Sequence, residues 1–262
     1  TINEFTIPYS NRCERIALVL SAYDDLIENN LRRIELLEQA ARNLFEEWFV
    51  RLKFPGHEHT KITDGVPEGW EKKTLNDLCQ SVGGGTPSTA RREYWDNGSI
   101  YWVTPTDITR NKFLVLLDTE KKITESGLRH SSAKLVPPDT ILMTSRASLC
   151  FFAICEHTVS TNQGFISIIP YDEDLRMYLL FNLMVRKEEI ISHASGSTYK
   201  EINKTVFRGL PIIYPSKVVT AEFNKRVYTH LQQVRLLMKQ NQKLRQARDL
   251  LLPKLMTGEI AV

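Results

Sequence analysis

Residues 31–42 read LRRIELLEQAAR, a run of strong helix formers inside a longer segment without Gly or Pro, residues 12–50. Apolar side chains recur in this segment in alternating steps of four and three, with one polar member, Asn30. These seam positions are Ile16, Leu20, Tyr23, Ile27, Asn30, Ile34, Leu37, Ala41, Leu44 and Trp48. The pattern predicts one long helix with a heptad seam, ended by Pro55 and Gly56.

The end of the chain repeats this pattern, again with one Asn in the middle of the seam. The positions are Phe223, Val227, His230, Val234, Leu237, Asn241, Leu244, Arg248 and Leu251. Pro253 and Gly258 mark the end of this second helix. At 1.5 Å per residue each helix is about 45–55 Å long, and neither can bury its apolar seam alone.

The two seams predict an antiparallel coiled coil within one chain. When the helices are aligned so that paired residue numbers add to 271, Trp48 lies opposite Phe223 and Asn30 lies opposite Asn241. A buried Asn pair fixes the register of such a coil at a cost in stability. The alternative is that both helices pack on the middle of the chain or on other chains.

Composition and charge restrict the class of protein. Hydrophobic residues make up 42% of the 262 residues and charged residues 25%, which is typical of a soluble globular protein and argues against long disorder, collagen and disulfide scaffolds. The net charge is −2 for residues 1–55, −1 for 56–216 and +6 for 217–262, so the two ends attract one another.

Several sequence features bear on location and processing. No run of about 18 apolar residues predicts a membrane span, and the N-terminus, TINE, lacks a signal-peptide pattern. Because the chain does not begin with Met, we expect a fragment or a processed product. The four cysteines form no C-x-x-C pair and indicate reduced, buried thiols in a cytoplasmic protein. His57 and His59 lie beside turn residues, so we expect no metal site.

The middle of the chain, roughly residues 57–216, has short β-rich runs separated by turn residues and one expected helix at residues 175–192. The expected strands are residues 100–103, 112–117, 140–145, 151–155 and 165–169. We therefore predict one α/β (α+β) domain of about 160 residues, flanked by two long helices that form an antiparallel coiled coil.

Catalytic motifs are mostly absent. The GGGT at residues 83–86 is not followed by the Gly-Lys-Ser/Thr of a P-loop, and the dinucleotide-binding, serine-hydrolase and zinc-protease signatures are missing. Two Glu-x-Lys triplets, at residues 71–73 and 120–122, together with Asp64 or Asp107 loosely match the metal-binding signature of nucleases. Because such triplets arise often by chance in a highly charged chain, a nuclease is a minor alternative.

Polar loops offer ligands for phosphates and bases. The glycines of residues 81–92, SVGGGTPSTARR, would allow close backbone approach, and its hydroxyls and paired arginines suit phosphate oxygens. The amides of Asn162 and Gln163 suit adenine edges, or they hold a turn together. Similar loops span residues 104–112, 144–146 and 195–200. Each also fits an ordinary solvated loop, but together they indicate contact with nucleic acid.

Motifs along nearly the whole chain resemble one known family. They are RIALVLSAYDDLIENN at 15–30, LFEEWFV at 44–50, VPEGW at 66–70, GGTPST at 84–89, YWVTP at 101–105, TNQGF at 161–165, SGST at 195–198, LPI at 210–212 and LLLPKLMTGEI at 250–260. Their order and spacing are similar to the specificity subunit of type I restriction-modification systems, in which target-recognition domains alternate with helical spacers.

The resemblance has two departures. A turn of the family pattern S-R-x-P-I-G corresponds to residues 145–150, SRASLC, which lack the Pro and the Gly. Family members usually carry two recognition domains, whereas this chain carries one, so it looks like the second half of a subunit or a naturally short one. The implied domains are a proximal spacer at 1–55, a recognition domain at 56–216 and a distal spacer at 217–262.

The resemblance implies a non-catalytic subunit. It would read one half of a split site in double-stranded DNA and dock the methyltransferase subunits, while a separate restriction and translocation subunit would join through the complex. S-adenosylmethionine, ATP and Mg²⁺ would act on those partners only, so we expect no cofactor on this chain and no membrane. A homodimer is a further expectation. The rival interpretation is a coiled-coil scaffold whose middle domain binds protein.

The resemblance also implies roles for individual residues. The expected phosphate contacts are Lys72, Lys73, Arg91, Arg92 and Lys200, and the expected base readers are Arg110, Lys112, Arg129, His130 and Arg146. Further expected DNA contacts are Thr86, Ser88, Thr89, Thr198 and Tyr199. The expected spacer and partner interface is Asn30, Ile34, Leu37, Trp48, Phe223, Leu237, Asn241 and Leu244.

Overall fold

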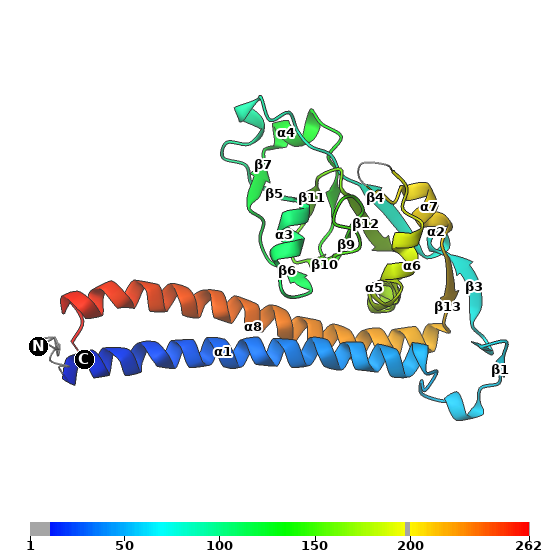
Figure 1. Ribbon diagram of the computed structural model, residues 1–262, viewed down its shortest axis with the longest axis horizontal. Coiled ribbons are helices and arrows are strands. Elements are labelled where there is room, and N and C mark those ends of the chain that lie inside the picture. Colours follow the sequence, from blue (N-terminus) through cyan, green and yellow to red (C-terminus); the bar gives the residue numbers. More distant parts are fainter. Residues whose placement is uncertain (1–10, 197–199, 262) are drawn as a thin grey trace, which may run out of the picture. The chain divides into compact units, whose positions relative to one another are not determined.

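The computed structural model describes residues 11–196 and 200–261. Two long helices, α1 (Asn11–Phe45) and α8 (Lys217–Thr257), run side by side in opposite directions (Figure 1). Helix α8 continues through Pro253 and ends immediately before Gly258, whose φ of +82° is the left-handed conformation common after a helix end. The expected antiparallel coiled coil is confirmed.

Contacts between the two helices follow the predicted register. Asn30 Nδ2 donates to Asn241 Oδ1 at 2.9 Å, and the ring centroids of Trp48 and Phe223 lie 5.9 Å apart. Asn241 Nδ2 also donates to the Ile27 carbonyl at 3.3 Å. Because both asparagines are buried, these hydrogen bonds satisfy amides that would otherwise be costly inside an apolar seam.

The first helix does not keep α-helical geometry to the end of the predicted segment. A π-helical turn, η1 (Glu46–Val50), follows α1, and Arg51 N donates to the Glu46 carbonyl at 2.8 Å. This wider turn lets the neighbouring Trp48 and Phe49 both contact Phe223, with Phe49 at 4.9 Å between ring centroids. The heptad pattern predicts only Trp48 at this contact.

The middle of the chain contains two larger mixed sheets (Figure 1). The first is five-stranded and includes a parallel pair, β10 and β6. Its strands, in spatial order, are β4 (Cys79–Gly83), β12 (Phe165–Pro170), β9 (Ile141–Thr144), β10 (Phe152–Cys155) and β6 (Val115–Leu116). The second is four-stranded and orders β7 (Lys121–Ile123), β5 (Ile100–Val103), β11 (Val159–Thr161) and β8 (Leu135–Val136).

One buried apolar cluster joins the two sheets. Leu142 and Phe165 from the five-stranded sheet pack with Val103 and Val159 from the four-stranded sheet and with Ile108. Ile108 belongs to α3 (Pro105–Arg110), a helix capped by a reciprocal Thr104–Asp107 capping box. The sequence interpretation of residues 104–112 as a polar loop is therefore wrong over the helix, and the missed signal is the Thr-Pro-Thr-Asp cap.

Smaller elements complete the domain. Two-stranded sheets pair β1 (Ile62–Thr63) with β2 (Val66–Pro67), and β3 (Glu71–Thr74) with β13 (Pro211–Tyr214). Short helices include α2 (Leu75–Leu78), α4 (Glu125–Arg129), α7 (Lys204–Gly209), η2 (His57–His59), η3 (Arg92–Tyr94) and η4 (Glu173–Leu175). The single helix predicted at residues 175–192 is instead two, α5 (Arg176–Val185) and α6 (Lys187–Ser192).

An aromatic cluster connects the ends of the long helices to α5. Phe45 lies 6.0 Å from Phe181 and 6.1 Å from Tyr178 between ring centroids, and Phe49 lies 4.8 Å from Tyr178. Tyr178, Phe181 and Phe45 are all nearly inaccessible to solvent. Large buried rings contribute strongly to packing, so these contacts hold α1 against the domain.

The chain divides into two compact units, residues 1–37 with 232–262 and residues 38–231. Both long helices therefore contribute to each unit. The domain boundaries between residues 55 and 56 and between residues 216 and 217 remain predictions. Cys79, Cys150 and Cys155 are buried as expected, but Cys13 is exposed on α1, so the prediction that all four thiols are buried is wrong.

Candidate nucleic-acid interface

Four loops converge beside the end of β5, and we call them the four-loop site. They are residues 84–86, 145–147, 161–164 and the described part of 195–201. Gly85 N donates to the Thr161 carbonyl and Ser145 N to the Gly164 carbonyl, each at 2.8 Å. Ala147 N donates to the Lys200 carbonyl at 3.3 Å. Backbone hydrogen bonds therefore hold four segments that are distant in sequence in one place.

The glycines of this site serve packing between loops. A Cβ on Gly84 would lie 2.1 Å from the Asn162 carbonyl oxygen, and one on Gly85 would lie 2.3 Å from Ser132 Oγ. Neither position has room for a side chain. Packing against residues 161–162 and 132–133 therefore requires Gly at these two positions, and close approach of a ligand to their backbone stays a prediction.

The two amides of the site are oriented by the protein. Asn162 Oδ1 accepts from Gly164 N at 2.9 Å, which closes an Asx turn, and Gln163 Oε1 accepts from the Thr86 hydroxyl. Asn162 N donates to the Val103 carbonyl at 3.0 Å, which ties the turn to β5. Asn162 is half-buried and Gln163 is exposed. The interpretation that these amides hold a turn together is thus confirmed for Asn162.

Charged side chains surround the amides. Arg146 Nε lies 3.9 Å from a carboxylate oxygen of Glu201, and both side chains are about half exposed. Lys200 is exposed, and Lys204 Nζ would lie 2.9 Å from a Cβ on Gly83. Sequence reasoning missed Glu201 and Lys204, although both follow the predicted loop within a few residues. Thr198 and Tyr199 lie outside the described residues.

The turn that lacks the family's Pro and Gly adopts a left-handed backbone at two positions. Ala147 has a φ of +62° and Cys150 a φ of +56°. This conformation is uncommon for residues other than Gly, and Cys150 adopts it where the resemblance places a Gly.

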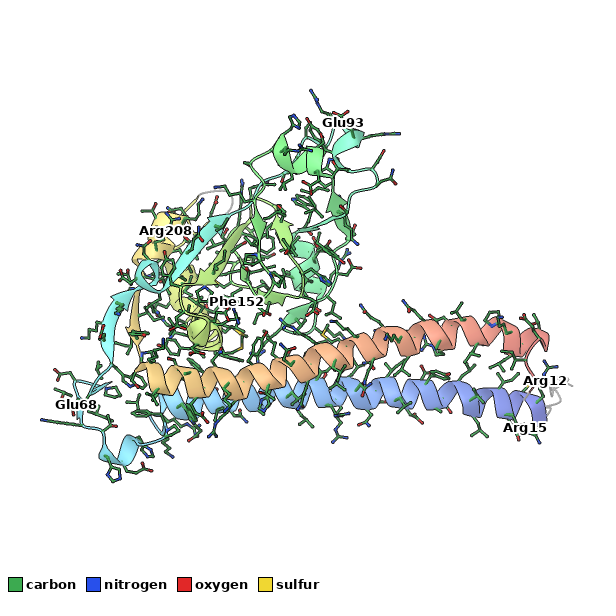
Figure 2. The ribbon with its side chains drawn as sticks, turned by 180° about the vertical axis from the view of Figure 1, so that it is seen from behind. Arg12, Arg15, Glu68, Glu93, Phe152 and Arg208 are labelled. Carbon is green, nitrogen blue, oxygen red and sulfur yellow. The ribbon has the colours of Figure 1, made fainter. Side chains whose placement is uncertain are left out.

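A second group of predicted contacts gathers around Tyr94, and we call it the η3–α4 cluster. The His130 ring stacks on Tyr94 at 5.8 Å with an interplanar angle of 5°, and the Arg91 guanidinium lies 5.5 Å from the Tyr94 ring centroid. Thr124 Oγ1 donates to the Glu93 carbonyl at 2.9 Å, which joins α4 to η3 (Figure 2 labels Glu93). Arg92 and Arg129 belong to these two elements.

A short segment links the two groups. Thr86 and Arg91 are five residues apart, so their Cα atoms are separated by at most about 18 Å. Within this segment the Ser88 carbonyl accepts from Trp95 Nε1 at 3.1 Å. Thr89 lines an open groove with Trp95, Glu120, Lys121 and Lys122. The predicted contacts from Thr86 to Arg92 therefore lie along one continuous stretch.

The structure places Lys72 and Lys73 away from the η3–α4 cluster. Both belong to β3, and Figure 1 shows β3 and β13 at the opposite end of the domain from α4. Lys73 Nζ lies 3.0 Å from Glu71 and 4.2 Å from the Tyr214 ring centroid.

Arg208, on α7, donates from Nε to the Ser81 hydroxyl at 2.7 Å (Figure 2 labels Arg208). This hydrogen bond holds α7 against β4.

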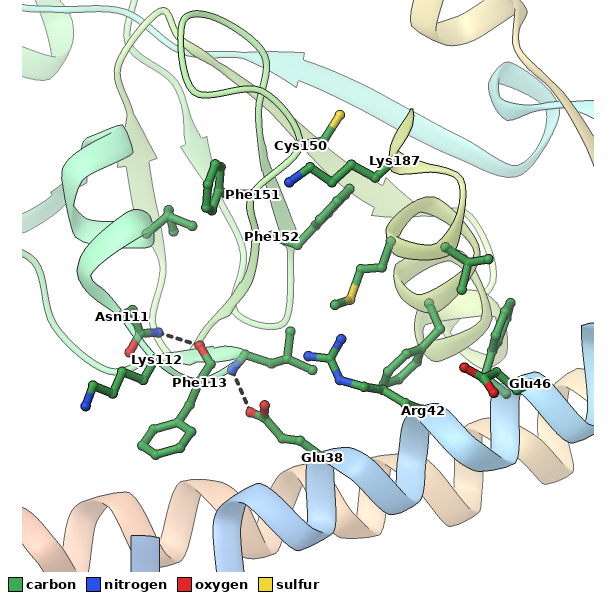
Figure 3. A pocket seen from close by; sticks show the side chains of 16 residues that line it. Glu38, Arg42, Glu46, Asn111, Lys112, Phe113, Cys150, Phe151, Phe152 and Lys187 are labelled. Atoms are coloured by element: carbon green, nitrogen blue, oxygen red, sulfur yellow. Dashed lines mark hydrogen bonds between the residues drawn. The ribbon is translucent and has the colours of Figure 1, made fainter. Parts of the chain in front are cut away.

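Arg110 and Lys112 also lie apart from the four-loop site. Arg110 is exposed and lies 3.4 Å from Glu120. Lys112 lines a cavity of about 350 Å³ whose walls include Phe113, Phe151 and Phe152 (Figure 3). Expected base readers are thus distributed over at least three places in the domain.

Sequence reasoning did not predict this cavity. Glu38, on α1, accepts from Leu114 N at 2.6 Å, and Lys187 Nζ lies 4.7 Å from the Phe151 ring centroid (Figure 3). Burial raises the pKa of the Cys150 thiol at its edge to about 11, so this thiol is protonated and unreactive at neutral pH. The hydrogen bond from Leu114 N to Glu38 holds this part of α1 against the segment that leads into β6.

The positions of Asp107 and of the two Glu-x-Lys triplets do not support the nuclease alternative. Asp107 Oδ2 accepts from Thr104 N at 2.7 Å, and its Oδ1 accepts from Glu120 N at 2.9 Å. Glu71 pairs with Lys73 on the separate β3–β13 sheet. Over residues 11–196 and 200–261, no group of three or more His, Cys, Asp or Glu is placed to hold a metal ion. No helix in that part of the chain is long and apolar enough to cross a membrane.

Comparison with known proteins identifies the family. The model of the type I restriction modification DNA specificity domain matches residues 67–246, and the chain belongs to this family of specificity subunits. The MjaIX specificity subunit of Methanocaldococcus jannaschii is 36% identical over 169 residues, which cover 63% of this chain and 39% of that subunit. The HindI specificity subunit of Haemophilus influenzae is 26% identical across 97% of this chain and 68% of that subunit.

Solved structures agree in fold. The S subunit of a type I restriction-modification system from M. genitalium has a TM-score of 0.65 at 19% identity, and the match covers 94% of this chain and 61% of that one. A second type I system structure matches with a TM-score of 0.52 and covers 60% of its chain. The chain therefore spans 39% of the MjaIX subunit and about 60% of these solved chains.

Proposed function

We propose that this chain reads one half of a bipartite site in double-stranded DNA as a non-catalytic specificity subunit. The observation that carries the proposal is the family match over residues 67–246, which includes both the four-loop site and the η3–α4 cluster. These two groups gather exposed amide, hydroxyl and guanidinium donors from segments far apart in sequence. Such donors suit the oxygen-rich surface of a duplex.

Base readout is the proposed role of the η3–α4 cluster. Arg129 supplies a guanidinium group, and His130 adds a ring whose Nδ1 lies 2.9 Å from the Ser126 carbonyl. A guanidinium that donates twice to guanine in the major groove discriminates against other bases by about 1–3 kcal/mol. The stacked Tyr94 and His130 rings would orient this surface.

The helix pair is the proposed dock for methyltransferase subunits. Asn30 and Trp48 contact Asn241 and Phe223 across the helix pair, so we propose that a partner uses other side chains. Several large apolar residues of the helix pair remain exposed to solvent. Within residues 11–37 and 232–261 these are Leu18, Leu26, Leu36, Leu236, Leu250, Leu252 and Met256. Exposed apolar groups of this kind mark interaction surfaces.

The remaining partners and cofactors follow from this role. S-adenosylmethionine, ATP and Mg²⁺ would act on the methyltransferase and restriction subunits, and the chain itself would hold none of them. A restriction subunit would join through the assembled complex. A second copy of the chain would supply the other half-site. This arrangement would operate in the cytoplasm, where the DNA is.

Duplex binding at several salt concentrations tests the proposal. With methyltransferase subunits present, the logarithm of the affinity should fall linearly with the logarithm of salt concentration. Arg129→Ala should cost about 1–3 kcal/mol and relax preference at one base pair, whereas Lys225→Ala, an exposed change on α8, should change neither. If binding changed neither with salt concentration nor with Arg129→Ala, the result would favour the alternative of a coiled-coil scaffold whose middle domain binds protein.

A further inference from the structure

The two side-chain amides of the four-loop site are oriented with their carbonyl oxygens toward protein donors. Asn162 Oδ1 is engaged by Gly164 N at 2.9 Å, and since a backbone N–H only donates, this orientation of the amide is fixed. Gln163 Oε1 accepts from the Thr86 hydroxyl, which likewise leaves its NH₂ group available. Each carbonyl oxygen has two lone pairs, and the protein uses one of them in each amide. The NH₂ groups are the donors that these amides offer to a ligand.

The neighbouring side chains are cationic. Arg146 and Lys200 are exposed at the same loops, and Lys204 lies against β4 at Gly83. Arg and Lys carry only donors and a positive charge, and the two oriented amides add their NH₂ donors. Phosphodiester oxygens only accept hydrogen bonds and carry negative charge, whereas base edges, including the acceptor-only edge of guanine, are uncharged. The site therefore matches a phosphate better than a base.

One acidic group opposes this pattern. The Glu201 carboxylate lies 3.9 Å from Arg146 Nε and is about half exposed. The backbone of Glu201 pairs with Ser195 at 2.8 and 3.0 Å, so the strand-like bridge does not depend on the side chain. The carboxylate is therefore placed to compete with an anionic ligand for Arg146.

We propose that the four-loop site binds a phosphate of the DNA backbone through Asn162, Gln163, Arg146 and Lys200, and that Glu201 weakens this contact. The inference rests on the proposed DNA-reading function and assigns this site to sequence-independent positioning. Base readout then belongs to other residues of the domain. Arg146 is a phosphate contact in this assignment, and not the base reader that the sequence predicts.

We expect two variants to change the affinity for duplex DNA in opposite directions. Glu201→Gln frees Arg146 and removes a charge that repels phosphate, so it tightens binding to every duplex by about two- to fivefold at low salt. Gln163→Glu adds a carboxylate at the site and weakens binding to every duplex by about tenfold or more, with a smaller salt dependence. Neither variant shifts the preferred base sequence.

Controls with the same charge changes lie outside the site and outside the proposed methyltransferase dock. Glu222→Gln on α8 removes a carboxylate 2.7 Å from Arg226, and Asn76→Asp on α2 adds one at an exposed position. Both should leave duplex affinity unchanged. All variants are measured in the complex with methyltransferase subunits, on a panel of duplexes that differ at each base pair, with circular dichroism to confirm folding.

The outcomes distinguish the phosphate assignment from the proposed DNA-reading function on which it rests. Uniform effects over the panel support the phosphate site. A wild-type complex that prefers a sequence, combined with variants that alter preference at a single base pair, overturns the phosphate assignment and keeps the DNA-reading function. Unchanged affinity in both variants also overturns the assignment. A wild-type complex that binds no duplex contradicts the proposed function itself.

Discussion

At the residue scale, the pair formed by Asn30 and Asn241 shows how a polar contact sets the register of the helices. Both side chains are buried, and the 2.9 Å hydrogen bond satisfies one amide with the other. A shift of one helix along the other would leave two buried amides facing apolar side chains. Such groups cost free energy when unpaired, so the pair selects one alignment.

Replacing one or both asparagines tests this explanation. Asn241→Leu leaves the buried Asn30 amide without its partner, and we expect the free energy of unfolding to fall by about 1–3 kcal/mol. The double change of Asn30 and Asn241 to Leu should recover most of that loss, because two apolar groups can pack in the seam. Urea unfolding followed by circular dichroism measures both. Additive losses in the double variant would contradict a direct interaction between the two residues.

Some residue contacts follow from the sequence and others do not. The Asn30–Asn241 contact follows from the heptad spacing, because helical periodicity converts residue numbers directly into faces. The requirement for Gly at positions 84 and 85 does not, since it arises from residues 161–162 and 132–133, respectively, which approach only in the folded domain. The same holds for Glu38, which bonds to Leu114 at a separation of 76 residues.

At the element scale, four of the five predicted apolar runs match strands, the run at 112–117 forms only the two-residue β6, and the apolar β13 and the polar β3 and β7 were not predicted. The runs at 100–103, 140–145, 151–155 and 165–169 coincide with β5, β9, β10 and β12. Strand β3, with the sequence EKKT, and β7, with KKI, carry too few apolar residues to indicate a buried face. Tertiary pairing with β13 and β5 determines these strands, and local preference does not.

The exposed leucines of the helix pair give a prediction at the same scale. Leu36 and Leu236 each precede a seam residue by one position, and their side chains are 61% and 58% exposed. Changing both to Gln should alter the free energy of unfolding by less than about 0.5 kcal/mol. Methyltransferase binding should weaken by about 2 kcal/mol or more, because burying each Leu contributes about 1.5–3 kcal/mol.

Calorimetric titration with the methyltransferase subunit measures this loss. Leu135→Gln, which changes another exposed leucine on β8 of the recognition domain, is the matched control and should leave the affinity unchanged. Equal affinities for the wild type and the Leu36/Leu236 variant would place the partner elsewhere.

At the scale of the whole molecule, the proposed function requires a DNA-reading domain joined to a docking element. Helices α1 and α8 contribute to both compact units of the chain. The sequence indicates this organisation because two separated seams match one another. It does not indicate which bases are read, since base preference depends on the positions of a few side chains to within fractions of an ångström.

Selection from a randomised duplex library, with and without the methyltransferase subunit, tests the central claim most directly. We expect one short motif to be enriched when the partner is present, and a second, symmetrically spaced copy if two chains associate. Arg129→Ala should relax that motif at one base pair, while Gln163→Glu should weaken enrichment without changing the motif. No enriched motif in either condition would contradict the account of this chain as the DNA-reading subunit.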